Sequence, residues 1–308
     1  MIHTKKLSIL FFSLLVLLNT RAAFANLNVF ACEPEWASLV QELGGKHVQV
    51  VSATNGAQDP HHVQARPSLL SKARKANLLV CTGADLEIGW LPLLQRKTGN
   101  PAIQNAGDGY FMASQTVSML GIPASLDRSS GDVHEMGNPH IHTDPNNIND
   151  VAEALNQRLQ LLDPDNAEQY ESRYQSFKQR WQTALKRWNK QAKTLRGKRV
   201  VVYHKSWIYM NDWLGLKQVA TLEPKPGIPP SSDHLSKLLK KMQKHPADII
   251  IYAAYQSPRS THWLSERTSI PVVELPFTVG GIEGVNNLFD LYNETLRRLQ
   301  QATSEASH

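Results

Sequence analysis

The sequence contains little cysteine, no uninterrupted apolar run long enough to span a membrane, and only a small excess of positive charge. Two cysteines among 308 residues exclude cysteine-based zinc fingers and small domains held by several disulfides. Three of the 33 basic residues, Lys5, Lys6 and Arg21, lie within residues 1–25, which contain no acid. Without them 30 basic residues face 27 acidic ones, a balance too even to indicate nucleic-acid binding.

The first 25 residues have the pattern of a secretory signal. Lys5 and Lys6 precede a twelve-residue apolar run, Leu7–Leu18, which is interrupted only by two serines. Ala23-Phe24-Ala25 has the small residues of a cleavage site. The run is shorter than the ~20 residues that a bilayer span needs, so an uncleaved anchor or a buried helix is the weaker alternative. We expect cleavage after Ala25 and a periplasmic location.

The remainder of the chain alternates strand-like and helix-like segments. With 41% hydrophobic residues and a length of about two average domains, it has enough apolar side chains to form a core. This order predicts an α/β fold with mainly parallel, covered sheets. Predicted strands are Leu27–Ala31, Val48–Ser52, Leu78–Cys81, Val200–Tyr203, Lys217–Leu222, Asp248–Ala253 and Val272–Leu275, and predicted helices are Trp36–Leu43, Leu69–Ala76, Leu86–Thr98, Ile148–Leu162, Trp207–Leu214, His234–Lys244, Thr261–Thr268 and Leu288–Ala302.

One predicted helix is unusually long. Asn166–Leu195 contains neither proline nor glycine, and ~30 residues make a rod of roughly 45 Å. A coiled coil is the usual alternative for this length, but the apolar stripe is narrow and mostly aromatic, which favours packing along its own domain. The stripe consists of Tyr170, Tyr174, Phe177, Trp181, Leu185 and Trp188. We therefore expect an N-terminal lobe over 26–148, a helical segment over 149–196 that contains this linking helix, and a C-terminal lobe over 197–308.

Histidines occur three times in loops at the ends of predicted strands. His61 lies in an Asp-Pro-His-His sequence, His140 in an Asn-Pro-His sequence, and His204 follows the predicted strand Val200–Tyr203. Each alone has an ordinary interpretation as a turn residue, a helix cap or a packed side chain. Together they indicate a metal site, because such loops form ligand sites in open α/β sheets and neutral imidazole is a common zinc ligand.

The two cysteines leave two alternatives open. Cys32 and Cys81 each follow or end a predicted strand in the N-terminal lobe, and an exported protein meets oxidising conditions. They form a disulfide, or they are two small buried apolar residues.

The motifs resemble those of the metal receptors of bacterial zinc and manganese ABC importers, the cluster A-I binding proteins with the TroA-like fold. The matching stretches are Asp59-Pro60-His61, Thr82–Glu87 with Trp90-Leu91, Asn138-Pro139-His140 with Asp144-Pro145, and His204 with Gly215-Leu216. The resemblance covers essentially the whole mature chain. It implies two lobes joined by a long backbone helix, an inner-membrane ABC metal permease as partner, and His61, His140 and His204 as the metal ligands.

The sequence departs from this family at one place. The family often supplies a fourth ligand, an aspartate, where this chain has residues 275–281, which contain no carboxylate. Three imidazoles without that oxygen favour Zn²⁺ as the transported ion, with manganese or iron as the alternative. Water, His62, Glu283 or a carboxylate from elsewhere remains open as the fourth ligand. His142 is an auxiliary candidate, with His134 near it, and Asp59 and Asp144 are candidates to orient ligand imidazoles.

The same histidines permit two other functions. Three histidines and a water also form catalytic zinc sites, but no HExxH-like glutamate follows a ligand histidine, which disfavours an exported hydrolase. A surface adhesin on the same fold is the other alternative. We expect a monomeric binding protein that is not an enzyme and does not bind nucleic acid. Its metal affinity should fall as the pH drops through ~6.5, because only neutral imidazole binds metal.

Overall fold

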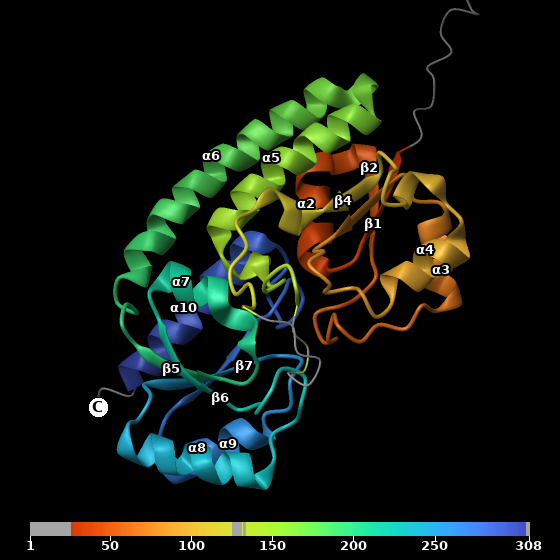
Figure 1. The fold of residues 1–308 in the computed structure, drawn as a ribbon. Helices are drawn as coiled ribbons and strands as arrows, with labels where there is room; N and C mark the ends of the chain where they lie inside the picture. Colours follow the sequence, from red (N-terminus) through yellow and green to blue (C-terminus); the bar gives the residue numbers. More distant parts are fainter. Residues whose placement is uncertain (1–25, 125–130, 132–133, 306–308) are drawn as a thin grey trace, which may run out of the picture.

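Two parallel β-sheets form the centres of two lobes (Figure 1). The computed structural model describes residues 26–124, 131 and 134–305, so the predicted signal segment lies outside the described residues. The first sheet has the strand order β2-β1-β3-β4 and the second β6-β5-β7-β8. Their strands are β1 (Leu27–Ala31), β2 (Val48–Ser52), β3 (Leu78–Cys81), β4 (Tyr110–Met112), β5 (Arg199–Val202), β6 (Lys217–Thr221), β7 (Ile249–Ala253) and β8 (Val272–Leu275).

Helices cover both faces of each sheet, as the alternating sequence predicts. All strand pairs are parallel, and this arrangement needs a helical cover because both faces of its strands are apolar. The helices are α2 (Pro34–Gly44), α3 (Pro67–Arg74), α4 (Leu91–Thr98), α5 (Pro145–Leu162), α6 (Ala167–Ala192), α7 (Ile208–Leu214), α8 (Ser232–Lys244), α9 (Arg259–Thr268) and α10 (Leu288–Glu305). None of the described helices combines the length and apolar character that a bilayer span requires.

Alternate side chains of the strands enter different cores. Phe30 and Leu79 face an outer core with α3 and α4, whereas Val29 and Val80 face an inner core with α2, α5 and α6. In the second sheet, Val201 faces an outer core with α8 and α9, while its neighbours in β5 face the same inner core as the first sheet. The period of two along each strand therefore builds one core that is continuous between the lobes.

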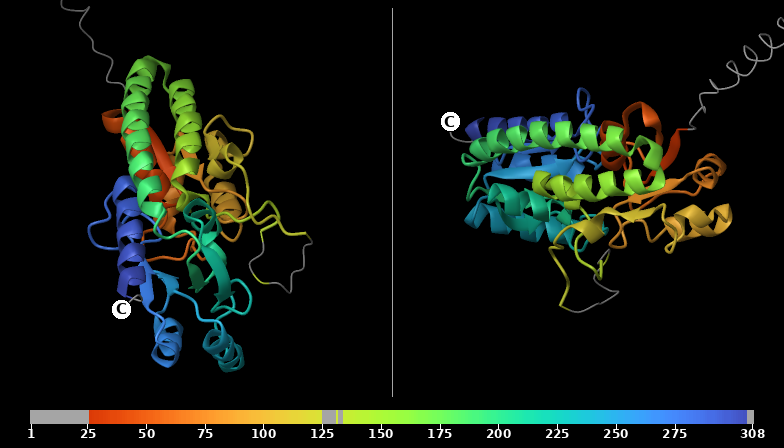
Figure 2. Two further views of the ribbon diagram at one scale, coloured as in Figure 1. Left: turned by 90° about the vertical axis from the view of Figure 1, so that its left-hand side faces the viewer. Right: turned by 90° about the horizontal axis from the view of Figure 1, so that it is seen from above.

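The long helix α6 supplies the apolar face that joins the lobes. It runs beside α5 along the first lobe and beside α10 along the second (Figures 1 and 2). Trp181 stacks on Phe177 and meets Phe289 of α10 edge-on, and its indole N–H donates to the Pro145 carbonyl oxygen at 2.9 Å. The predicted aromatic stripe and its packing within the chain are thus confirmed.

Several predicted helix boundaries differ from the structure by two or more residues, and the backbone explains two of them. The long helix ends at Ala192, not Leu195, because residues 193–197 form turns that lead into Gly197 with φ 81°. The helix predicted from Leu86 begins at Leu91, because backbone with positive φ occupies residues 83–85 and turns continue to Trp90. The predicted lobe boundaries at 148 and 196 stay predictions.

The cysteine question is answered by the structure. Cys32 and Cys81 form a disulfide, with their Cα atoms 4.8 Å apart at the ends of the neighbouring parallel strands β1 and β3. Both side chains are fully buried, and the backbone N–H of Cys32 donates to the Val80 carbonyl oxygen at 2.8 Å. The bond therefore links two strands at the edge of the sheet that faces the other lobe's loops.

Trp181→Ala should destabilise the protein strongly. The indole is fully buried between α6, α5 and α10, so truncation leaves a large cavity and removes the hydrogen bond from the indole N–H to the Pro145 carbonyl oxygen. We expect a loss of about 3–5 kcal/mol of unfolding free energy, measured by chemical denaturation. Leu161→Ala, at an exposed leucine of α5, is the control and should change it by less than about 0.5 kcal/mol. Equal midpoints for the two variants would contradict this account of α6.

Candidate metal centre

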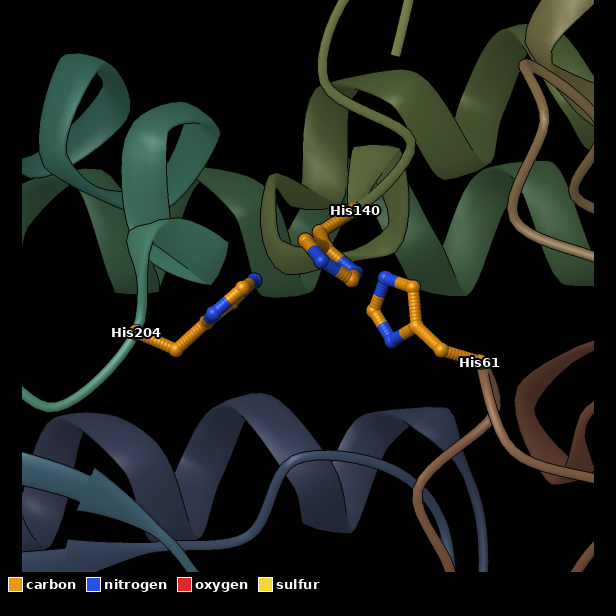
Figure 3. Close-up of side chains that lie close together, drawn as sticks. All are labelled: His61, His140 and His204. Carbon is orange, nitrogen blue, oxygen red and sulfur yellow. The ribbon is translucent and has the colours of Figure 1, made fainter. Parts of the chain in front are cut away.

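His61, His140 and His204 converge between the lobes. His61 lies in the loop after β2, His140 precedes a short 3₁₀ turn (Ile141–Thr143) that leads into α5, and His204 follows β5. Each offers a ring nitrogen within 4.8 Å of those of the other two. The ring centroids are 5.3 to 5.9 Å apart, and the rings turn toward one another (Figure 3). Three segments distant in sequence therefore present nitrogen donors to one point.

Several of these ring nitrogens are buried without a hydrogen-bond partner among the described residues. His140 is fully buried and His204 is 7% exposed. Neither ring nitrogen of His140, nor Nε2 of His61, has a hydrogen-bond partner among the described residues. A buried polar atom without a partner is unfavourable. A metal ion bound by these nitrogens would remove that cost, so the donor set fits a divalent ion with an imidazole preference.

Carboxylates orient two of the three imidazoles. Asp59 lies 2.8 Å from His61 Nδ1, and Glu223 lies 2.6 Å from His204 Nδ1. A carboxylate accepts from Nδ1–H, which leaves the Nε2 lone pair free for a metal. Burial opposes the ionisation of Asp59, but its hydrogen bonds with His61 and the charge of that ring outweigh this and hold the pKa of the carboxyl below its ordinary value.

His140 is kept neutral by its surroundings. Burial and the neighbouring rings of His61, His204, His142 and His134 hold the pKa of His140 well below its ordinary value. Its position is fixed through the backbone: the amide of His140 donates to Asn138 Oδ1 at 3.1 Å, and its carbonyl accepts from the Thr143 hydroxyl at 2.9 Å. A neutral imidazole is the form that binds metal.

Glu223 was not identified from the sequence, where residues 223–230 suggest only a rigid loop. It lies two residues after β6, the strand that pairs with β5, and therefore next to the strand that ends before His204. An acid at the carboxyl end of a strand beside a histidine-bearing strand is the signal that sequence reasoning missed. Glu223 also accepts from the Gly227 backbone N–H at 3.0 Å, which ties the loop to the site.

The other candidate residues lie outside the centre. His62 and Glu283 are exposed. The carboxylate of Asp144 accepts from the backbone and side chain of Asn146 at 2.8 and 2.7 Å, so it caps α5, and burial raises its pKa to about 6 despite those bonds. The ring of His134 lies 5.5 Å from that of His61, which brings the loop before His140 near the site.

His142 belongs to a buried network between the lobes. Its Nε2 lies 3.0 Å from the Phe277 carbonyl oxygen and its Nδ1 3.2 Å from the Glu35 carboxylate. The Thr278 hydroxyl of the second lobe donates to the same carboxylate. Nearby, Gly56 approaches Gly280 and Gly281 so closely that a Cβ on Gly56 would collide with their backbone. The residues 275–281 thus supply a carbonyl and a hydroxyl to a contact between the lobes.

A cavity of about 220 Å³ adjoins the centre. His61 and His204 line it together with the carboxylates that orient them, and so do Tyr255 and Gln256. A second group of potential ligands, Cys32, Cys81 and Glu87, lies within the first lobe. The disulfide removes both thiolates from this group, so it does not form a second metal site.

Comparison with known proteins agrees with this arrangement. Residues 29–302 match the family described as zinc-uptake complex component A, periplasmic. The metal ABC transporter substrate-binding lipoprotein ScbA of Streptococcus cristatus is 21% identical, over 84% of this chain and 82% of its own. The manganese ABC transporter substrate-binding lipoprotein scaA of Streptococcus gordonii is 23% identical, with the same coverage.

Solved structures of such proteins share the fold. A crystal structure of ZnuA superposes with a TM-score of 0.72 at 20% identity, over 92% of this chain and 99% of the other. A laminin-binding adhesin from Streptococcus agalactiae gives 0.73 at 20% identity, over 90% of this chain and all of the other. The chain belongs to the zinc-uptake component A family, the substrate-binding receptors of metal ABC transporters, which are receptors and not enzymes.

Proposed function

We propose that this chain captures Zn²⁺ at His61, His140 and His204 and delivers it to an ABC permease of the inner membrane. The observation that carries the proposal is that each of the three histidines offers a ring nitrogen within 4.8 Å of those of the other two. Both ring nitrogens of His140 and Nε2 of His61 have no protein partner among the described residues. Two of the rings are oriented by carboxylates, which is the usual arrangement around histidines that bind zinc.

The choice of zinc follows from the chemistry of the donors. Imidazole nitrogen suits zinc, whereas manganese prefers sites rich in carboxylate and water oxygen. Asp59 and Glu223 are engaged with Nδ1 of their histidines, and residues 275–281 contain no acid. Manganese is the second candidate, because relatives are named manganese receptors and two carboxylates border the site. Competition between the two ions for the site shows which of them the protein binds more tightly.

Water is our assignment for the fourth coordination position. The cavity beside His61 and His204 is lined by polar groups and is large enough for several water molecules. His62 and Glu283 are exposed and His142 is engaged with Phe277 and Glu35, which argues against each as the fourth ligand. An open fourth position also gives a route by which the ion enters and leaves.

Release requires that one lobe loosen its ligand. His204 and Glu223 both come from the second lobe, and the loop after Glu223 closes through the contact with Gly227. The shared core around α6 and the contacts of Glu35 and Gly56 oppose wide opening. We therefore assign release to a local movement of the loop that carries Glu223, with little relative motion of the lobes.

The cellular setting completes the proposal. Residues 1–25 form a signal that is cleaved after Ala25, and the mature chain acts as a monomer in the periplasm. The family description names the periplasm, and relatives are named lipoproteins of ABC transporters, which also act outside the cytoplasm. N-terminal sequencing of the exported protein tests the cleavage site.

Metal-free protein titrated with Zn²⁺ should bind about one ion, and Mn²⁺ should compete only weakly. The reason is the nitrogen-rich donor set, because such sites have a higher affinity for zinc than for manganese. Competition with a chromophoric chelator measures both affinities under the same conditions. Equal affinities, or tighter binding of Mn²⁺, would contradict the assignment to zinc.

His204→Ala should weaken Zn²⁺ binding by at least about 100-fold. Loss of groups that only orient a ligand typically costs about 10–100-fold, and loss of a ligand should cost more. His245→Ala, at an exposed histidine of the same lobe, is the matched control and should bind zinc normally. Circular dichroism checks that both variants fold. Normal binding by the folded His204→Ala protein would remove His204 from the site.

Glu223→Gln should weaken Zn²⁺ binding by roughly 10–100-fold. The amide is a weaker acceptor for His204 Nδ1–H and carries no charge to support the metal-bound ring. Glu266→Gln, at an exposed glutamate of the same lobe, is the control. Chelator competition measures both variants, and equal affinities would show that Glu223 does not orient the ligand.

A further inference from the structure

The turn after β3 has an unfavourable backbone conformation. Gly83, Ala84 and Asp85 have φ values of 78°, 49° and 64°. Positive φ costs glycine little, but alanine and aspartate adopt it rarely, and here two such residues follow one another. A conformation of this kind persists only where surrounding contacts hold it, and such turns cluster at functional sites. The contacts that hold this one are therefore informative.

Two buried glutamates hold the turn. The carboxylate of Glu87 accepts from the backbone N–H of Thr82 at 2.8 Å and of Gly83 at 3.0 Å. The carboxyl of Glu33, from the loop after β1, accepts from the Thr82 hydroxyl at 3.1 Å. Glu33 and Glu87 are each only 2% exposed. The turn is thus closed by two carboxyl groups that have been removed from water.

The two carboxyl groups meet at the same backbone group, because the Thr82 N–H lies 3.3 Å from Glu33 Oε2 and 2.8 Å from Glu87 Oε1. Two ionised carboxylates held this close without water repel each other and can only accept hydrogen bonds, which favours a proton on one of them that is donated to the other. Oε1 of Glu33 is buried with no other partner, whereas Glu87 already accepts from two backbone N–H groups. The proton therefore belongs on Glu33, whose O–H donates to Glu87.

The surroundings favour retention of that proton. Burial raises the pKa of Glu33 well above its ordinary value, and the negative charges of Glu87 and of Glu35 on α2 add to the effect. Burial also raises the pKa of Glu87 to about 7, although its hydrogen bonds oppose the rise. The Tyr110 hydroxyl of β4 and Asp85 of the turn are the other titratable groups beside the pair, and the adjacent Cys32–Cys81 disulfide does not titrate.

The turn supports the loop that carries His61. The segment that follows Glu87 lies under this loop, where the Trp90 indole N–H donates to the Pro60 carbonyl oxygen at 3.3 Å. A Cβ placed on Gly89 would lie 3.5 Å from the His61 carbonyl oxygen, which is ordinary contact distance. Trp90 is 1% exposed and lies three residues after Glu87, so a buried side chain close in sequence to the turn contacts the loop of His61.

We propose that Glu33 and Glu87 share one buried proton, and that this acid pair positions His61 by holding the turn at residues 82–87 closed. Ionisation of both carboxyls places two charges side by side without water and removes the hydrogen bond between them. The turn then loses one of the contacts that hold Ala84 and Asp85 at positive φ. The acid pair itself is independent of the metal, whereas the effect on His61 rests on the proposed function.

The retained proton gives folding a defined dependence on pH. In the unfolded chain Glu33 loses its proton near its ordinary pKa, while the folded protein keeps it. Because the folded protein holds one more proton than the unfolded chain, the folding equilibrium constant falls about tenfold for each unit by which the pH rises. This holds from about pH 5 up to the pH at which the folded pair releases the proton. Glu33→Gln removes this term, because its amide donates to Glu87 at every pH.

The first experiment detects the proton in metal-free protein. Chemical denaturation between about pH 6 and 8 should show the ratio of wild-type to Glu33→Gln folding constants falling by about tenfold per pH unit. The infrared spectrum of the wild type near pH 7 should contain a protonated carboxyl band that Glu33→Gln lacks. A ratio that does not change with pH, or the absence of that band from the wild type, would overturn the shared proton. If the variant fails to fold, the infrared spectrum of the wild type still shows whether a protonated carboxyl is present.

The second experiment tests the link to His61. Near pH 7, Glu33→Gln should bind Zn²⁺ within about twofold of the wild type, whereas Glu33→Ala should bind about tenfold more weakly. Normal zinc affinity in Glu33→Gln would show that residue 33 acts through its hydrogen bond and not through a negative charge. Glu266→Gln is the control. Wild-type affinity in folded Glu33→Ala would overturn the positioning role. If the wild type bound no zinc, the proposed function would fail, and the first experiment would still decide the acid pair.

Discussion

The structure depends on one shared hydrophobic core. The inner faces of both sheets pack against the same set of helices, and α6 contributes its aromatic face to both lobes. Two sheets with separate cores would be free to rotate about their connection, whereas a core that includes Trp181 and Trp188 must be disrupted before the lobes separate. This core sets the relative placement of the three segments that carry the histidines.

A rigid frame changes how a binding site works. The centre is built from loops that follow the strands or precede α5, so a local movement of one loop can loosen a ligand while the lobes keep their places. The network of Glu35, His142 and Thr278 adds a buried polar contact between the lobes behind the centre. On the side of His204 and Glu223, the Gly227 N–H ties the loop after β6 to the site, and a hydrogen bond from the Ile228 N–H to the Lys225 carbonyl oxygen closes the turn of that loop. Capture and release then depend on the movement of this one loop.

The sequence predicts the fold well because its signals are periodic and local. All seven predicted strands agree with the structure within one residue at each end, and four of them, such as Leu27–Ala31 and Leu78–Cys81, have identical bounds. The stripe from Tyr170 to Trp188 gives both the long helix and its buried face. The helix predicted from Leu86 starts five residues too early. Nothing in the local pattern shows that Ala84 and Asp85 adopt positive φ, because contacts with Glu33, distant in sequence, hold them there.

The candidate site is predictable only in part for a related reason. Motifs around His61, His140 and His204 identify the three residues that the structure brings together, and Asp59 lies two residues from its histidine. Glu223 is 19 residues from His204, and only the pairing of β5 with β6 brings them together. Asp144 is followed by a proline, as Asp59 is, and each carboxylate accepts from the backbone N–H two residues later; that residue is Asn146 in one case and His61 in the other, so Asp144 caps α5 and does not orient a ligand. Two partners that are separated in sequence by a strand and a helix can be identified only when the pairing of the strands in the folded structure is known.

Four buried or half-buried acids in this protein differ in the partner that each one meets. Asp59 and Glu223 each face an imidazole N–H and so direct the opposite ring nitrogen to the metal. Burial opposes the ionisation of Asp59, but its contacts with His61 lower the pKa of that carboxyl. Glu33 and Glu87 face each other, so one must hold a proton. Both arrangements act on the same loop, since Asp59 orients the His61 ring and the acid pair supports the backbone beneath it through Trp90 and Pro60. The position of His61 therefore depends on one acid remaining ionised and another remaining protonated at the same pH, which is possible only because burial and partner differ between the two sites.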